Sequence, residues 1–119
     1  MKHVIYNNII PFKGFKAIAL WPFVFVRNSA RERFTQFDEN HERIHLKQQV
    51  EMLLVFFYLW YGIEWLVRLV AYRHAREAYR NISFEQEAYI YQGKENYLAK
   101  RRWYAWTKFL NKKSFVYKD

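Results

Sequence analysis

The sequence contains no cysteine, which excludes a disulfide framework and leaves histidine and carboxylate side chains as the ligands for any metal ion. Its 119 residues leave no room for a second domain, so we expect a single domain over residues 1–119. A long hydrophobic run is also missing: Leu53 to Ile63 covers eleven residues, whereas a membrane-spanning helix needs about 20. A membrane-spanning segment is therefore not favoured.

A cleavable signal peptide is not favoured either. The apolar stretch Ala17 to Val26 begins sixteen residues into the chain, and Asn28-Ser29-Ala30 is a poor small-x-small cleavage site. We therefore expect a cytoplasmic protein, with membrane association as a further possibility.

Acidic residues are scarce, since 11 Asp and Glu stand against 20 Lys and Arg, and the formal net charge is +9. Such a balance favours anionic partners, namely acidic lipid, nucleic acid or an acidic substrate, without choosing among them. Aromatic residues make up 22% of the chain. That share supplies a compact core, and the surplus can serve a membrane contact or self-association.

Two of the four histidines fall in the stretch His41-Glu42-Arg43-Ile44-His45, which has H-E-x-x-H spacing. An α-helix turns by roughly 100° and rises about 1.5 Å per residue, so His41 and His45 lie one turn apart on one face and can bind one tetrahedral metal ion. Glu42 lies beside that face. Its carboxylate can take a proton from water whose pKa a zinc ion lowers to about 7. A catalytic site would need a third ligand from elsewhere.

The pattern of apolar residues predicts an α+β fold, with a small N-terminal hairpin or sheet beside three to four packed helices. Strands are expected at about 15–20 and 23–27, where β-branched and aromatic residues cluster and Pro22 forces a bend or an edge position. A helix from about 39 to about 60, capped by Asp38 or Asn40, carries the H-E-x-x-H motif. Its expected buried stripe is Leu46, Val50, Leu53 and Phe57.

A second helix is expected from Ile63 to about Arg80, after a break or kink at Gly62, with His74 as a surface histidine. The final segment, Tyr97 to Lys113, is predicted to form an amphipathic helix with tryptophans on one side and basic residues on the other. This helix can pack on the core or contact an acidic membrane surface.

Ser83 and Gln86 have the spacing of a capping box, which predicts that a third helix begins at this point. Glu85 and Glu87 then lie in its first turn, a rigid position from which a carboxylate can reach a facing helix. Because Glu85 and Glu87 are two positions apart, they point to different sides of the helix and only one should face a metal ion.

With these two motifs the chain resembles the gluzincin metallopeptidases, and in size their minimal single-domain forms. The resemblance implies a zinc ion held by His41, His45 and Glu85, with Glu42 as general base and Glu87 as the runner-up ligand. Tyr89 stands where the family has an Asp that orients a zinc-binding histidine, and its hydroxyl could replace that carboxylate as a hydrogen-bond partner or, less readily, serve as an oxyanion stabiliser. The resemblance also implies an edge strand above the site that could bind an extended peptide.

We therefore expect a zinc-dependent hydrolase, foremost a small metallopeptidase acting on a peptide or protein substrate. The alternative is a non-catalytic basic, aromatic module that binds an acidic membrane surface or, less readily, nucleic acid.

Overall fold

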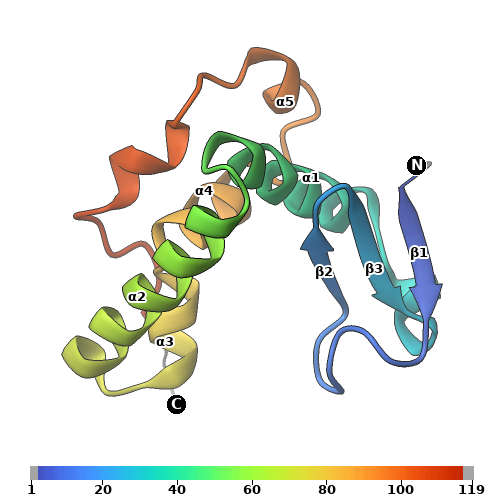
Figure 1. The fold of residues 1–119 in the computed structure, drawn as a ribbon, viewed down its shortest axis with the longest axis horizontal. Coiled ribbons are helices and arrows are strands. Elements are labelled where there is room, and N and C mark those ends of the chain that lie inside the picture. Colours follow the sequence, from blue (N-terminus) through green and yellow to red (C-terminus); the bar gives the residue numbers. More distant parts are fainter. Residues whose placement is uncertain (1–2, 117–119) are drawn as a thin grey trace.

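The computed structural model describes residues 3–116 and has the expected α+β fold, with a small sheet beside packed helices (Figure 1). The sheet contains β1 (Val4–Asn7), β2 (Ala17–Leu20) and β3 (Phe23–Arg27) in the order β1-β3-β2. β2 and β3 form the predicted hairpin around Trp21 and Pro22, while β1 pairs parallel to β3. β1 was not predicted, and β2 is left as an edge strand.

The α-helices are α1 (Gln36–Glu51), α2 (Val55–Tyr72), α3 (Ala75–Arg80), α4 (Ser83–Tyr91) and α5 (Tyr97–Lys100), with 3-10 helices η1 (Asn28–Arg33) and η2 (Ala105–Phe109). The H-E-x-x-H motif lies on α1, the first long helix, as predicted. α1 lies between the sheet and the pair α2 and α4 (Figure 1), and a hydrophobic cluster lies on each side of it. On the sheet side the buried residues are Ala19, Val24, Val26 and Ala30. On the side of α2 and α4 they are Phe57, Ile82, Phe84 and Trp106.

α1 begins three residues earlier than predicted because Thr35 caps it. The Thr35 hydroxyl accepts a hydrogen bond from the Asp38 backbone N–H, and the Asp38 carboxylate accepts one from the Thr35 backbone N–H, which completes a capping box. Asp38 therefore belongs to the cap, whereas Asn40 lies inside the helix and is buried.

α1 ends at Glu51, so the prediction of one helix from 39 to 60 is wrong. The Leu54 N–H bonds to the Gln49 carbonyl and the Leu53 N–H to the Val50 carbonyl, which is the Schellman pattern. Leu53, with φ of 52°, occupies the left-handed position that glycine normally takes. The chain turns there, and the predicted buried stripe fails because Val50 and Leu53 are 42% and 72% exposed.

The break between the first and second predicted helices, expected at Gly62, is also displaced. Gly62 lies inside α2, which ends instead at Arg73 in a left-handed conformation (φ 55°). His74 is half-buried rather than a free surface residue, because its Nδ1 accepts a hydrogen bond from the Glu77 backbone N–H and caps α3. The single predicted helix from Ile63 to Arg80 is therefore wrong.

α4 begins at Ser83 as predicted, but the capping box does not form. The Ser83 backbone N–H and hydroxyl both donate to the Glu64 carboxylate of α2, and the Gln86 side chain donates to the Asn81 and Lys112 carbonyls. The predicted amphipathic helix from Tyr97 to Lys113 is wrong as well, since only the short α5 and η2 are helical within it. This segment instead wraps across α4, where Trp106 and Phe109 are buried.

Candidate metal centre

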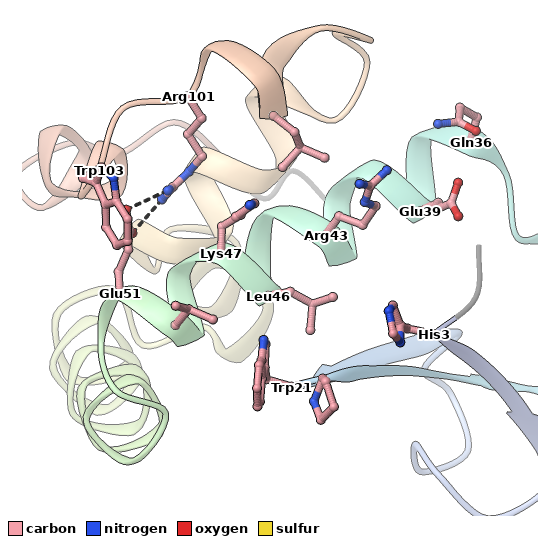
Figure 2. A pocket seen from close by; sticks show the side chains of 13 residues that line it. His3, Trp21, Gln36, Glu39, Arg43, Leu46, Lys47, Glu51, Arg101 and Trp103 are labelled. Carbon is pink, nitrogen blue, oxygen red and sulfur yellow. Dashed lines mark hydrogen bonds and ion pairs between the residues drawn. The ribbon is translucent and has the colours of Figure 1, made fainter.

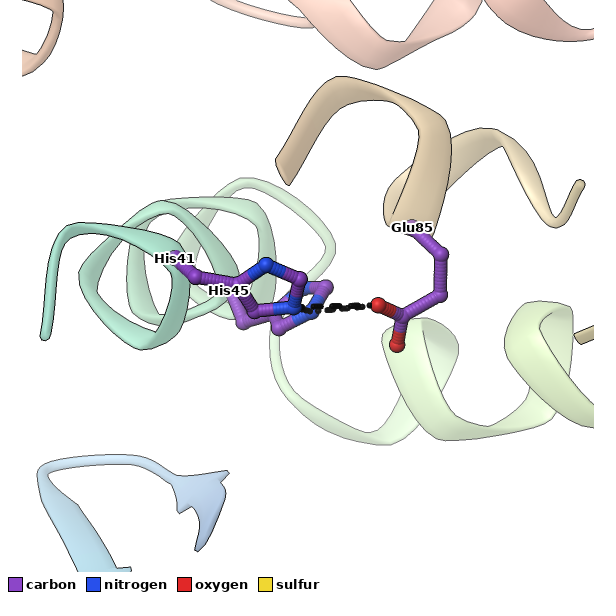
Figure 3. A group of neighbouring side chains, drawn as sticks. All are labelled: His41, His45 and Glu85. Atoms are coloured by element: carbon purple, nitrogen blue, oxygen red, sulfur yellow. Dashed lines mark hydrogen bonds and ion pairs between the residues drawn. The ribbon is translucent and has the colours of Figure 1, made fainter. Parts of the chain in front are cut away.

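The two histidines of α1 and one glutamate of α4 meet in the interior of the protein (Figure 3). The His41 and His45 Nε2 atoms are 3.2 Å apart, and each lies 3.1 Å from Glu85 Oε1. The three side chains are 4–8% exposed. The structure thus brings together three residues that could hold a metal ion, and they are those singled out from the sequence.

The separations match the size of a zinc site. Four ligands at about 2.05 Å from a tetrahedral Zn²⁺ are separated by about 3.3 Å. The observed triangle has edges of 3.1–3.2 Å, so the ligand atoms would move apart by only a few tenths of an ångström. Each Nε2 atom lies within hydrogen-bond distance of the Glu85 carboxylate oxygen that would be the third ligand.

The outer nitrogens of both imidazoles are held by amide oxygens. His45 Nδ1 lies 2.7 Å from Gln48 Oε1, and His41 Nδ1 lies 2.7 Å from Gln92 Oε1. The Gln48 amide is oriented because its nitrogen donates to the Phe84 carbonyl and to Glu87 Oε1. The oxygen facing His45 therefore accepts a hydrogen bond from Nδ1–H, so in the neutral imidazole Nε2 has no proton and its lone pair is directed at the centre. Metal-binding histidines are typically fixed in this way.

Glu85 and Glu87 have different roles, as their spacing on α4 required. The Glu85 carboxylate directs Oε1 toward the histidines, and its Oε2 accepts a hydrogen bond of 2.6 Å from the Tyr61 hydroxyl of α2. Glu87 accepts hydrogen bonds from Gln48, Tyr97 and Arg101. Glu87 therefore lies outside the group that could hold a metal ion, and it contacts Gln48, the partner of His45.

Tyr89 does not replace the family's Asp as a hydrogen-bond partner of a histidine. Its ring packs against His41 at 69°, with 4.4 Å between ring centroids, and its hydroxyl lies near that of Tyr79. Gln92 and Gln48 take the orienting role instead. Gln48 could have been found from its i+3 spacing to His45, whereas no local pattern points to Gln92 or Tyr61.

Charge is concentrated at this buried site. Burial disfavours the imidazolium form of His45, but the Glu85 carboxylate outweighs burial and raises the pKa of His45 to about 9. Burial likewise opposes ionisation of Glu85, yet the two histidines hold the pKa of that carboxyl well below its usual range. Burial, reinforced by Glu85, raises the pKa of Glu42 against the pull of both histidines. The surroundings therefore favour the ionised form of Glu85, whereas Glu42 binds a proton more readily than a free glutamate does.

A cavity of about 340 Å³ opens onto the three residues and onto Glu42. It lies between α2, the edge strand β2 and the loop before β2, and its walls are mostly apolar. Within residues 3–116 no side chain donates a hydrogen bond to the half-buried Glu42 carboxylate. The carboxylate can therefore reach a molecule bound in the cavity.

A larger hollow of about 990 Å³ lies on the opposite face of α1 and is not part of this centre (Figure 2). Arg43 and Lys47 line it, and at one end Arg101 forms an ion pair with Glu51. It contains no group of three potential metal ligands among the described residues.

We predict that Gln92→Ala lowers the affinity for zinc by about 10- to 100-fold, because His41 loses the acceptor that fixes its ring. Lys47→Ala, which truncates an exposed side chain on the opposite face of α1, is the control and should leave the affinity unchanged. Competition with a chromogenic chelator measures both constants. Equal affinities for the two variants would show that Gln92 does not orient a ligand.

We also predict that zinc affinity rises with pH. A pKa of about 9 means that His45 is an imidazolium at neutral pH when no metal ion is bound, and zinc must displace the proton on its Nε2. Below pH 9 each pH unit should therefore raise the apparent affinity about tenfold for this proton, and the rise should stop above pH 9. Chelator competition at several pH values tests this, and a flat profile between about pH 7 and pH 9 would contradict it.

Comparison with protein-family models, with curated proteins and with solved structures gives no significant match. The case for a metal centre therefore depends on the geometry of His41, His45 and Glu85 and on the residues that hold them.

Proposed function

We propose that the protein is a zinc-dependent hydrolase, with peptide-bond hydrolysis as its reaction and a gluzincin-like arrangement of ligands. The observation that carries the proposal is the triangle of two Nε2 atoms and one carboxylate oxygen, whose lone pairs the surrounding hydrogen bonds direct inward. A structural zinc site would need a fourth protein ligand. Only His41, His45 and Glu85 form such a group among the described residues, and a cavity adjoins them, as a catalytic site requires.

Each residue has a separate role in this proposal. His41, His45 and Glu85 would hold the zinc ion, which supplies Lewis-acid polarisation of a carbonyl and acidification of water. Glu42 accepts the proton of the attacking water and passes it to the leaving amine nitrogen. Its raised pKa suits both steps, since the carboxyl must gain a proton and then release it. Gln48, Gln92 and Tyr61 orient the ligands.

The cavity walls favour an extended peptide with apolar side chains. Ala17, Ile18 and Ala19 of the edge strand β2 line one wall, and Phe12, Phe15 and Tyr58 supply aromatic surface. The Gln49 amide bonds the Ala19 carbonyl and the Trp21 N–H, so those backbone groups face α1 rather than β3. Because backbone groups alternate along a strand, Ala17 should direct its N–H and carbonyl the same way and could pair with a substrate.

The test is cleavage of a mixture of unfolded polypeptides, with products identified by mass spectrometry. Zinc-loaded protein should cleave next to apolar residues, chelation should abolish cleavage, and added zinc should restore it. Cleavage that survives complete zinc removal, or no cleavage by protein carrying one zinc per chain, would refute the proposal.

The alternative of a non-catalytic basic module stays a prediction. Its main structural support was a continuous amphipathic helix from Tyr97 to Lys113, and that helix does not form. α2, outside this segment, carries an exposed apolar surface of its own.

A further inference from the structure

α2 presents its apolar residues to the outside and its charged residues to the interior. Only 11% of the residues of this 18-residue helix are buried, so it is not a core helix of the protein. Its length and its mean hydropathy of 1.2 would suit a membrane. Every exposed residue of α2 is aliphatic, aromatic or glycine. We call this set the α2 apolar face: Val55, Phe56, Tyr58, Leu59, Trp60, Gly62, Ile63, Leu66, Val67, Val70 and Ala71.

The two charged residues of α2 are withdrawn from that face. The Glu64 and Arg68 side chains are 10% and 9% exposed and pair at 3.0 Å. Glu64 accepts hydrogen bonds from Ser83, and Arg68 donates to the carbonyls of Phe109, Leu110 and Lys112. Both charges are therefore satisfied by the protein itself, and the exposed face, about 27 Å long, carries none.

We propose that the α2 apolar face lies in the surface of a lipid bilayer, with the helix axis in the membrane plane. Phe57, Trp65 and Arg68 pack against the rest of the protein, so lipid cannot surround the helix and it does not span. A helix with one apolar face can instead sink that face into the boundary between headgroups and acyl chains. Tyr58 and Trp60 suit that depth because their rings have an apolar body and a polar group.

Charge favours a bilayer over a second copy of the chain. Two copies would bring a net charge of +9 against +9, whereas an anionic bilayer attracts a basic protein. Arg73 and Arg76 are exposed directly beyond the C-terminal end of α2, where they can meet lipid phosphates. A protein interface would also carry a polar rim, and none of the exposed residues of α2 is charged.

A second group of exposed apolar residues lies near the cavity that adjoins the candidate metal centre. Ile9, Phe12 and Phe15, in the segment between β1 and β2, are 80%, 83% and 55% exposed. Phe12 and Phe15 line the same cavity as Tyr58 of α2. The mouth of the cavity is thus flanked by apolar side chains on both sides, and bilayer contact would bring it close to the membrane surface.

Vesicle binding of the full chain tests the proposal. Because the chain has no cysteine, Val67→Cys and Phe37→Cys can each be labelled at one place with an environment-sensitive dye. These positions are 62% and 55% exposed, on α2 and on α1 respectively. With vesicles of equal parts phosphatidylcholine and phosphatidylserine, the dye at position 67 should shift to shorter wavelength and the dye at position 37 should not.

Substitutions on the α2 apolar face test how strongly that face contributes to vesicle binding. Leu59→Gln and Leu66→Gln, both at positions that are 56% exposed, should each weaken vesicle binding about tenfold. Phe37→Gln should leave it unchanged, and far-UV circular dichroism should show all three variants folded. Wild-type protein that stays in the aqueous phase, or variants that bind as tightly as the wild type, would overturn the proposal.

Self-association is the competing outcome. A blue shift of the dye at position 67 that grows with protein concentration in the absence of vesicles would assign the face to a second copy and overturn the proposal. His45→Ala should bind vesicles as the wild type does, because bilayer contact does not require zinc. A failure of vesicle binding can therefore be distinguished from a failure of the proposed hydrolase activity.

Discussion

Glu42→Gln should retain one zinc ion per chain and lower the rate of peptide hydrolysis by about 10²- to 10⁴-fold, the range typical for loss of a general base. The glutamine has nearly the same shape as the glutamate but cannot take a proton from water. Glu42 is not among the three residues that converge on the candidate centre, so the metal ligands stay in place. Zinc content and initial rates of cleavage, measured on the same preparation, separate the two effects.

Glu32→Gln is the matched control, because Glu32 is an exposed residue of η1 outside the cavity. The Glu32→Gln variant should cleave peptides at the wild-type rate. A Glu42→Gln variant that is fully active with zinc bound would show that Glu42 is not the general base. A variant that loses zinc would show that Glu42 supports the metal site instead.

Arg101→Ala should lower the free energy of unfolding by about 3–5 kcal/mol, the loss typical when one partner of a buried ion pair is removed. The Arg101 side chain is 5% exposed and bridges two acids of different helices, Glu51 of α1 and Glu87 of α4, whose side chains are 2% and 0% exposed. Figure 2 shows its ion pair with Glu51. Its nitrogens lie 2.7 Å and 2.9 Å from the Glu51 oxygens and 2.6 Å and 3.0 Å from those of Glu87. Without Arg101, two carboxylates remain buried without their cation.

Arg102→Ala removes the same side chain one residue later, where it is exposed, and should change stability by less than about 0.5 kcal/mol. Urea unfolding followed by circular dichroism measures both variants. If Arg101→Ala and Arg102→Ala have equal midpoints, the buried pair does not fasten the segment after α4 to α1. Glu87 also orients Gln48, so the folded fraction of Arg101→Ala should bind zinc more weakly.

The sequence was sufficient for the fold class and the hairpin but not for the ends of the helices. Leu53 and Arg73 adopt left-handed conformations where glycine usually ends a helix, so no local signal marks either stop. Gly62, the residue expected to break the helix, lies inside α2. Tertiary contacts decide these boundaries: Glu51 is held by Arg101 and by the Tyr104 backbone N–H, both far along the chain.

The candidate site was predictable as far as it depends on short motifs. Helical spacing joins His41 to His45, and the first turn of a helix presents Glu85. The residues that orient these three are single side chains from distant segments, such as Gln92 and Tyr61, and a single sequence cannot pair them. The packing role of Tyr89 follows only from the arrangement of α1 against α4.

The exposed face of α2 was missed because the apolar run in the sequence seemed to end at Glu64. Glu64 and Arg68 are four residues apart, so both lie on one side of the helix, and that side faces the interior. The opposite side continues apolar to Ala71. Whether a charge interrupts an apolar surface thus depends on the face that the charge occupies.

The most direct measurement of the central claim is the zinc content of purified protein by elemental analysis, repeated on His45→Ala. The three converging side chains predict one zinc per wild-type chain and almost none in His45→Ala, with far-UV circular dichroism showing that the variant is folded. A wild-type protein that takes up no zinc, or a folded His45→Ala variant that keeps a full equivalent, would contradict the account.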